Sequence, residues 1–143
     1  MKSASQPVQR KSLAGFRLRK HTDFVRAYAA ARKRQSASAS WFLAPQPPGA
    51  PASSAARVGL TVGKVLGKAH ERNRIKRRMR EALRRHVDLL PAGFDLILHP
   101  RRSVLTIEFA QLEAEIVLIL QQARTEMARA AMQTAAPQAT PSP

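Results

Sequence analysis

A dense group of basic side chains occupies residues 71–86. Eight of these residues are arginine or lysine, and only two are glutamate. Guanidinium and ammonium groups at this density bind the phosphates of a polyanion. In a helix that turns by about 100° per residue, four polar side chains project from one side: Asn73, Arg77, Arg80 and Arg84. Three more arginines extend that side: Arg74, Arg78 and Arg85.

An apolar series runs through the same stretch at intervals of three and four residues. It consists of Ile75, Met79, Ala82, Leu83, Val87 and Leu90. This spacing predicts an amphipathic helix whose apolar stripe packs on a core and whose cationic side faces solvent. The basic segment is therefore predicted to be part of the folded domain as well as its binding surface.

Catalytic groups do not form a recognisable site. The acidic residues make no cluster of the kind that a metal-dependent nuclease needs, and the four histidines occur singly among basic residues. The chain has no cysteine, which excludes disulfides, thiolate zinc sites and thiol catalysis. A Walker-type phosphate loop is also missing. The sequence therefore predicts a binding protein without catalytic residues, a metal site or a small-molecule substrate.

The overall charge narrows the class of partner. The 143 residues include 25 Lys and Arg against 9 Asp and Glu, a formal net charge of +16, which favours nucleic acid or an anionic membrane. No apolar run is long enough to span a membrane, and the apolar stripe of the basic helix is typical of a core rather than of a membrane-surface helix. No helix-turn-helix or zipper points to DNA. A basic helix that contacts packed RNA fits better, and the N-terminus lacks a secretory signal, so we expect a cytoplasmic protein.

One domain is predicted between two tails. Residues 1–15 are polar and basic, which is typical of a flexible arm. Residues 16–132 form the domain, which ends in a helix over residues 106–132. Residues 133–143 are rich in Thr, Ala, Pro, Gln and Ser and are predicted to be a disordered tail.

Strands are predicted on both sides of the basic helix. Residues 35–40 form a turn, and residues 41–44 and 57–65 have the pattern of strands around a Pro-rich loop, which suggests a hairpin. Residues 94–99 are apolar enough to form a central strand. The strand at residues 57–65, the basic helix and the strand at residues 94–99 follow in series, as in a crossover unit.

An aromatic pair lies in a helix predicted over residues 22–34, with Thr22 as its N-cap. Phe24 and Tyr28 are four residues apart and share one face of this helix. They either belong to the core or form a platform on which unpaired bases stack. Gly59, Thr61 and Gly63 share one side of the strand at residues 57–65, and the glycines predict close approach of a helix or a ligand there.

Two segments in series resemble the core of the bacterial ribonuclease P protein subunit. They are Arg57-Val-Gly-Leu-Thr-Val-Gly-Lys64 and Arg72-Asn-Arg-Ile-Lys-Arg-Arg-Met-Arg-Glu81. The second run is highly specific in this setting. The resemblance also includes the helix with Asp23-Phe24 and the strand at residues 94–99, so it spans residues 16–130.

This resemblance implies a fold and an activity. The fold would be an α/β (α+β) two-layer sandwich with a small mixed sheet and a left-handed βαβ crossover through the basic helix. The activity would be that of ribonuclease P, an endonuclease (a hydrolase) that removes the 5′ leader of precursor tRNA during tRNA processing. The partners would be the ribonuclease P RNA subunit, which catalyses the cleavage with its own bound Mg²⁺, and precursor tRNA. The protein would bind the leader and strengthen substrate binding.

The resemblance also assigns roles to residues. Six residues would contact the RNA subunit: Arg72, Asn73, Arg74, Lys76, Arg77 and Arg80. Three would line the leader cleft: Phe24, Tyr28 and Lys64. This chain has Gly63-Lys64-Val65 where many members have Ser or Ala before the lysine and a second Lys after it. Either Trp41 or Phe42 would face the cleft. A structural, ribosomal-type RNA-binding protein without a role in cleavage is the alternative.

Overall fold

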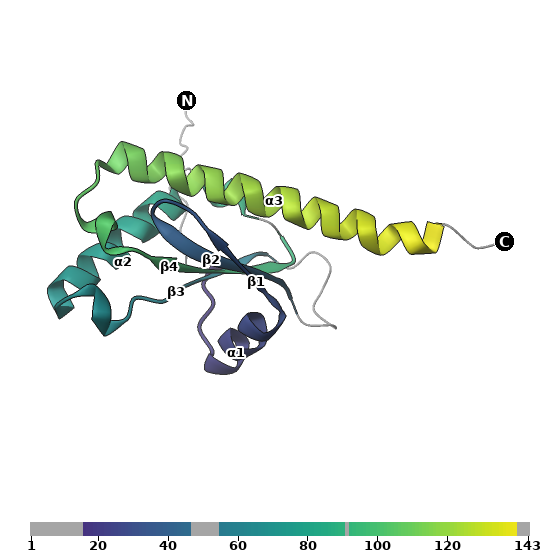
Figure 1. Cartoon of the computed structure of the whole chain (residues 1–143), viewed down its shortest axis with the longest axis horizontal. Helices are drawn as coiled ribbons and strands as arrows, with labels where there is room; N and C mark the ends of the chain where they lie inside the picture. The colour runs from purple at the N-terminus through teal and green to yellow at the C-terminus, as the bar shows by residue number, and fades with distance from the viewer. Residues whose placement is uncertain (1–15, 47–54, 91, 140–143) are drawn as a thin grey trace, which may run out of the picture.

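The computed structural model describes residues 16–46, 55–90 and 92–139 (Figure 1). Its helices and strands are, in chain order, α1 (His21–Ala30), β1 (Arg32–Gln35), β2 (Ala39–Pro45), β3 (Arg57–Leu60), α2 (Ala69–Arg84), β4 (Phe94–Pro100) and α3 (Phe109–Ala139). Short 3-10 helices connect them at Lys64–Leu66, Val87–Leu89 and Arg102–Leu105. The predicted basic arm, residues 1–15, lies outside the described residues.

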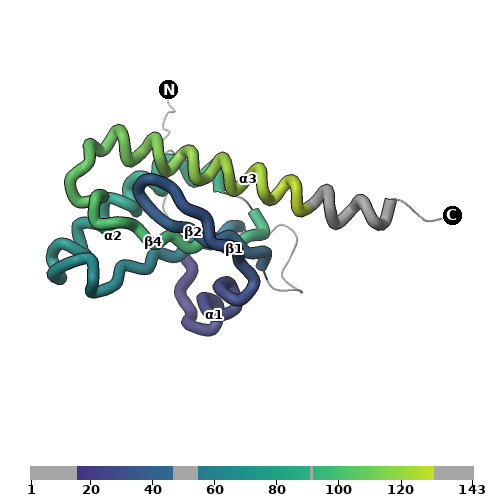
Figure 2. Tube along the Cα trace, viewed as in Figure 1, coloured from purple at the N-terminus to yellow at the C-terminus, as the bar shows by residue number. Residues whose placement is uncertain are grey.

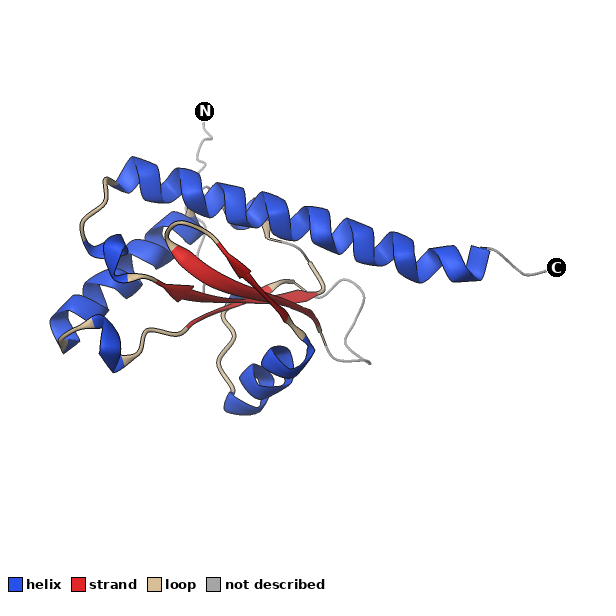
Figure 3. Ribbon diagram, viewed as in Figure 1, coloured by secondary structure: helices blue, strands red, loops and turns tan. Residues whose placement is uncertain are grey.

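The four strands form one mixed sheet (Figure 3). Their order in the sheet is β1-β2-β4-β3. β2 pairs antiparallel with both β1 and β4, and β3 pairs parallel with β4. α2 therefore makes the crossover between two neighbouring parallel strands, as the sequence predicted, and β4 is central. The predicted hairpin between residues 41–44 and 57–65 is wrong, because β4 lies between β2 and β3.

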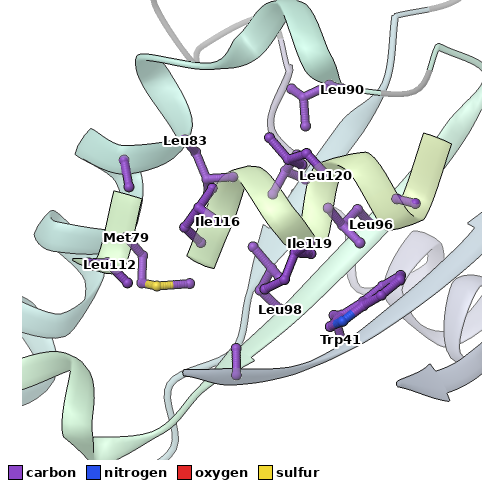
Figure 4. Packing of buried hydrophobic residues seen from close by; sticks show 14 of the residues in the cluster. Trp41, Met79, Leu83, Leu90, Leu96, Leu98, Leu112, Ile116, Ile119 and Leu120 are labelled. Carbon is purple, nitrogen blue, oxygen red and sulfur yellow. The ribbon is translucent and has the colours of Figure 1, made fainter. Parts of the chain in front are cut away.

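The main core lies between the sheet and the pair α2 and α3 (Figure 4). The predicted stripe of the basic helix is buried, and Ile75 and Met79 have no exposed surface. Trp41 of β2 and Leu96 and Leu98 of β4 meet these helices from the sheet. The α3 residues Leu112, Ile116, Ile119, Leu120 and Ala123 are buried in the same cluster. Burial of a large apolar side chain contributes roughly 1.5–3 kcal/mol, so this face fixes α2 against the sheet.

α1 covers the opposite face of the sheet (Figure 2). Alternate residues of the strands point to this side and form a smaller cluster around Leu18, Ala27, Ala44 and Ile97. A Cβ atom on Gly59 would lie 2.5 Å from Cζ of Phe24, so only glycine admits this ring. The predicted close approach is thus confirmed at Gly59.

An ion-pair cluster fixes α1 to the sheet. Arg57 of β3 donates to both carboxylate oxygens of Asp95, at 2.9 and 2.8 Å, and to Asp23 of α1 at 3.1 Å. Asp95 is only 3% exposed, and the pKa of Arg57 is raised chiefly by its hydrogen bond to this carboxylate. A bidentate pair of this kind holds its partners in one geometry, so α1 is oriented by charge as well as by packing.

Four helix and strand boundaries differ from the prediction. α1 ends at Ala30, and residues 32–35, predicted to be helix, form edge strand β1. The helix begins at His21 with Lys20 as its N-cap, rather than at Thr22. β3 ends at Leu60 rather than at residue 65, because a 3-10 helix begins at Lys64. α3 continues to Ala139, so its helical backbone includes part of the predicted tail.

Candidate RNA interface

The basic helix α2 has a well-defined start. Glu71 accepts a hydrogen bond from the backbone N–H of Lys68 at 2.9 Å and another from Nη2 of Arg102 at 2.9 Å. These interactions, with that of Arg102 the largest, lower the pKa of Glu71 from 4.5 to about 2. A carboxylate in the first turn also complements the helix dipole. The interface helix is therefore anchored at the end where its basic run begins.

The outward side of α2 is cationic and open. Asn73 and Arg77 are exposed, and among the described residues neither side chain makes a hydrogen bond or an ion pair. Lys76 and Arg80 are half-buried on the flank of this side. The pKa of Arg80 is lowered by burial and by the nearby charge of Arg17. A phosphate between these two guanidinium groups would relieve their repulsion.

The other flank of α2 is engaged with the protein itself. Nε of Arg74 donates to the carbonyl of Leu105 at 3.3 Å, and Arg78 donates to the carbonyl of Ile107. Arg85 lies 4.8 Å from the ring centroid of Phe109. The predicted single cationic side is thus divided: Arg74, Arg78 and Arg85 each contact the segment that leads into α3, whereas Asn73 and Arg77 do not. Arg74 and Arg85 remain exposed despite these contacts.

Two other predicted arginines also have partners. Nε of Arg72 donates to the carbonyl of Gly67 at 3.1 Å, so one of its N–H groups is used locally. Arg84 forms a salt bridge with Glu81 at 2.6 Å. A guanidinium group has five N–H donors, so Arg72 and Arg74 keep donors that can contact phosphate.

A second candidate surface lies between α1 and the sheet. The ring centroid of Tyr28 is 5.1 Å from that of Phe42 and 5.7 Å from that of His99, and both ring pairs are nearly perpendicular. The Tyr28 hydroxyl lies 2.7 Å from Nε2 of His99 and 3.1 Å from Oγ1 of Thr61. Trp41 is buried in the main core, so Phe42 is the β2 aromatic on the α1 side.

The two aromatic residues predicted to share a face of α1, Phe24 and Tyr28, have different surroundings. Phe24 is half-buried and inserts its ring over Gly59, which is a core contact. Tyr28 is half-buried too, but it lies in the ring cluster with Phe42 and His99. The two rings are 6.3 Å apart. The core interpretation therefore describes Phe24 well, and Tyr28 is the better placed of the two to meet a base.

Lys64 and His99 add polar groups near this cluster. Lys64 is exposed in the 3-10 helix that follows β3, three residues after Thr61. Burial of the His99 ring and the charge of Lys33 lower the pKa of this histidine. A neutral imidazole has one donor and one acceptor nitrogen, which suits contact with the edge of a base.

Sequence reasoning gave no role to Arg17 or His99, named Thr61 only as a neighbour of the strand glycines, and left Phe42 as an alternative to Trp41. Phe42, Thr61 and His99 come from separate segments that the strand pairing brings together, whereas Arg17 lies near Arg80 of α2. Phe42 had one usable signal. Because side chains alternate along a strand, Phe42 and Trp41 point to opposite faces of the sheet. Phe42 pairs with Ile97 on the face that contacts α1.

The described residues show neither a metal-binding cluster nor a membrane-spanning helix. Within residues 16–46, 55–90 and 92–139, no group of three or more His, Asp or Glu side chains is placed to hold a metal ion. No helix in the described part of the chain is long and apolar enough to cross a membrane.

Comparison with known proteins identifies the family. A family model described as Ribonuclease P matches residues 14–124. The chain belongs to the ribonuclease P protein family. The ribonuclease P protein component of Chloroflexus aggregans is 38% identical over 108 residues, which cover 75% of this chain and 76% of that protein. That of Thermobifida fusca is 33% identical over 103 residues and covers 70% of each.

Solved structures of the family share this architecture. The ribonuclease P protein of Thermotoga maritima superposes with a TM-score of 0.64 at 25% identity, covering 74% of this chain and 96% of that one. The Staphylococcus aureus protein gives a TM-score of 0.64 at 25% identity, with coverage of 76% and 95%. The resemblance inferred from the sequence and the α/β fold with a mixed sheet are both confirmed.

Membership of the ribonuclease P family indicates the enzyme and the RNA partner of this chain. The chain is a protein subunit of ribonuclease P, an endoribonuclease of tRNA processing, and membership implies a ribonuclease P RNA as partner. The alternative of a ribosomal-type protein is therefore not needed to account for the basic helix.

Proposed function

We propose that the chain docks on the ribonuclease P RNA through α2 and binds the 5′ leader of precursor tRNA between α1 and the sheet. The docking residues are those predicted from the resemblance: Arg72, Asn73, Arg74, Lys76, Arg77 and Arg80. The leader-binding surface consists of Phe24, Tyr28, Phe42, His99 and Lys64. Catalysis belongs to the RNA subunit and its Mg²⁺, and the protein supplies binding and orientation.

The open side of α2 supports the docking role. Arg77 and Asn73 are exposed without a protein partner among the described residues, so binding RNA breaks no salt bridge at either position. The amide of Asn73 both donates and accepts hydrogen bonds, which suits 2′-hydroxyl groups as well as phosphates. Because the apolar stripe of α2 is fully buried, the helix presents these groups on a rigid support.

The ring cluster of Tyr28, Phe42 and His99 is the observation that carries the leader-binding proposal. Three rings from α1, β2 and β4 meet within 5.1–5.7 Å of one another on the α1 side of the sheet. Half-buried rings beside cationic groups are the usual platform for unpaired bases, and each stacked base contributes roughly 1–3 kcal/mol. Lys64, which is exposed three residues after Thr61, supplies a cation for the phosphate backbone.

Reconstitution with a bacterial ribonuclease P RNA tests this function. The full chain is expected to lower the Mg²⁺ concentration at which the RNA cleaves a precursor tRNA that carries a leader. The protein is also expected to strengthen binding of that precursor much more than binding of mature tRNA, which has no leader. Absence of stimulation at low Mg²⁺ would reject the proposed function. Equal strengthening of both RNAs would reject leader binding while keeping the docking role.

A further inference from the structure

A basic groove runs between edge strand β1 and helix α3, away from the leader-binding surface. Its volume is about 580 Å³, and its lining includes Lys33 and Arg34 of β1 and Gln122, Glu126 and Arg129 of α3. A second hollow of about 390 Å³ shares Arg34, Glu126 and Arg129 and adds Arg32. Neither hollow contains a residue assigned to RNA-subunit docking or to the leader-binding surface.

Positive charge dominates this β1–α3 groove. Four cations line the two hollows, Arg32, Lys33, Arg34 and Arg129, against one carboxylate. That carboxylate, Glu126, lies 2.6 Å from Nε of Arg34, so their charges offset one another. Of the remaining cations, Arg32 and Arg129 line the hollow between β1 and α3, whereas the side chain of Lys33 points to the other face of the sheet. The two arginines favour a phosphate chain.

β1 connects the groove to the leader-binding surface. Lys33 pairs with Phe42 across the two strands, so both side chains point to the α1 face. The charge of Lys33 acts on His99, which belongs to the same ring cluster. Arg34 pairs with Trp41 and Arg32 with Leu43, so both arginines point to the α3 face. Positive charge therefore continues around the sheet edge from one face to the other.

The order of the strands gives this path a direction. Lys64 follows β3 at one edge of the sheet, and the RNA-docking helix α2 begins just after it. β1 is at the opposite edge. If α2 docks on the RNA subunit as proposed and the cleavage site lies beside that subunit, a leader that crosses the ring cluster runs from the Lys64 edge of the sheet towards β1.

We propose that the β1–α3 groove binds the phosphates of the upstream part of the leader after it passes over β1. This proposal rests on the proposed function. The occupant is single-stranded RNA rather than a duplex, because it must bend around a single strand of the sheet from one face to the other. Recognition is by charge, so it does not depend on base sequence in this part of the leader.

Leader length provides the test. Precursor tRNAs with leaders of about 5 and about 15 nucleotides, which bracket the usual site sizes for single strands, are bound to the reconstituted holoenzyme. The longer leader is expected to bind about tenfold more tightly, with a salt dependence steeper by about 1–2 units on a log–log plot. Equal affinities for the two leaders would overturn the proposal. Failure of the holoenzyme to bind even the short leader would instead reject the proposed function.

Variants locate the effect. Arg32→Ala with Arg129→Ala is expected to remove most of the advantage of the longer leader and to leave the short leader unchanged. Arg124→Ala is the matched control, because Arg124 is an exposed arginine of α3 outside the groove lining. Glu126→Gln is expected to increase the advantage. If the double variant weakens both leaders equally, or if Arg124→Ala has the same effect, the groove is not the site.

Crosslinking gives an independent readout. The chain has no cysteine, so Gln122→Cys provides a single attachment point for a photoreactive group inside the groove. Crosslinks are expected to the upstream nucleotides of the longer leader, and Arg124→Cys is expected to give few. Crosslinks from Gln122→Cys to the RNA subunit alone would show that a different RNA occupies the groove and would overturn the proposal.

Discussion

The hydroxyl of Tyr28 in α1 lies 2.7 Å from Nε2 of His99 in β4. The same hydroxyl lies 3.1 Å from Oγ1 of Thr61, which follows β3. One phenol thus joins the helix to two parallel strands while its ring remains part of the cluster proposed to bind the leader. The hydroxyl and the ring can be tested separately.

Tyr28→Phe keeps the ring and removes both hydrogen bonds. It is expected to lower the free energy of unfolding by about 1 kcal/mol, measured by urea denaturation, and to leave leader affinity nearly unchanged. Tyr28→Ala is expected to weaken binding of a leader-bearing precursor by about 1–3 kcal/mol. If Tyr28→Phe weakens leader binding as much as Tyr28→Ala does, the hydroxyl rather than the ring makes the contact.

Gly59→Ala tests the packing of α1. The added Cβ would lie 2.5 Å from Cζ of Phe24, so the ring must move, and overpacking of this kind costs about 1–3 kcal/mol of unfolding free energy. Gly63→Ala is the control, because its Cβ would meet nothing within 4 Å. The double variant Gly59→Ala with Phe24→Ala is expected to lose less than the sum of the single losses. Strict additivity would show that the two sites are independent.

Two adjacent arginines of α2 should give opposite results. Arg77→Ala removes an exposed cation and is expected to weaken binding to the RNA subunit and to reduce the salt dependence by about one unit, with stability unchanged. Arg78→Ala removes a donor to the carbonyl of Ile107 and a cation near Phe109, and is expected to lower the unfolding free energy by about 1–2 kcal/mol. Filter binding and urea denaturation measure the two effects, and equal loss of RNA affinity in both variants would contradict the division of the helix surface.

Acid should weaken the start of α2. The folded pKa of Glu71 is about 2, below its usual 4.5, so the folded state holds the ionised form more strongly than the unfolded chain does. Its contribution to stability is therefore complete above pH 4.5 and is lost as the pH falls towards 2. Glu71→Gln should lower the melting temperature at neutral pH, and its difference from the unchanged protein should shrink through this range. Glu81 also has a pKa of about 2, so it loses its charge over the same pH range in both proteins. The readout is therefore the difference in melting temperature between Glu71→Gln and the unchanged protein at each pH. A difference that stays constant with pH would mean that the charge of Glu71 does not contribute.

The local sequence pattern predicted the helices in which apolar residues recur on one face. The intervals of three and four residues in α2 and α3 correspond to buried side chains, because a helix that packs on a sheet must present one face. β1 carried no such signal. Its residues Arg32-Lys33-Arg34-Gln35 are charged or polar on both faces, which an edge strand tolerates because its side chains reach solvent.

Strand order could not be predicted from the same patterns. A hairpin of β2 with β3 and the observed insertion of β4 between them bury the same alternating residues. The choice depends on contacts distant in sequence, such as that between Arg57 and Asp95, which are 38 residues apart. α2 was predicted as a binding surface because its residues lie in one helix. Of the ring cluster, Tyr28 was predicted and Phe42 was one of two alternatives, but His99 was missed because the cluster is made from three elements.

The crossover also sets an order in time. Ribosomes make a chain from its N-terminus, so α2 is synthesised before β4, the strand that completes the centre of the sheet. His99, which contacts Tyr28, belongs to β4 and is therefore synthesised after α2. A nascent chain therefore has its basic helix segment before it has the surface proposed to bind the leader. An RNA that binds at that stage would meet the cationic segment without the ring cluster.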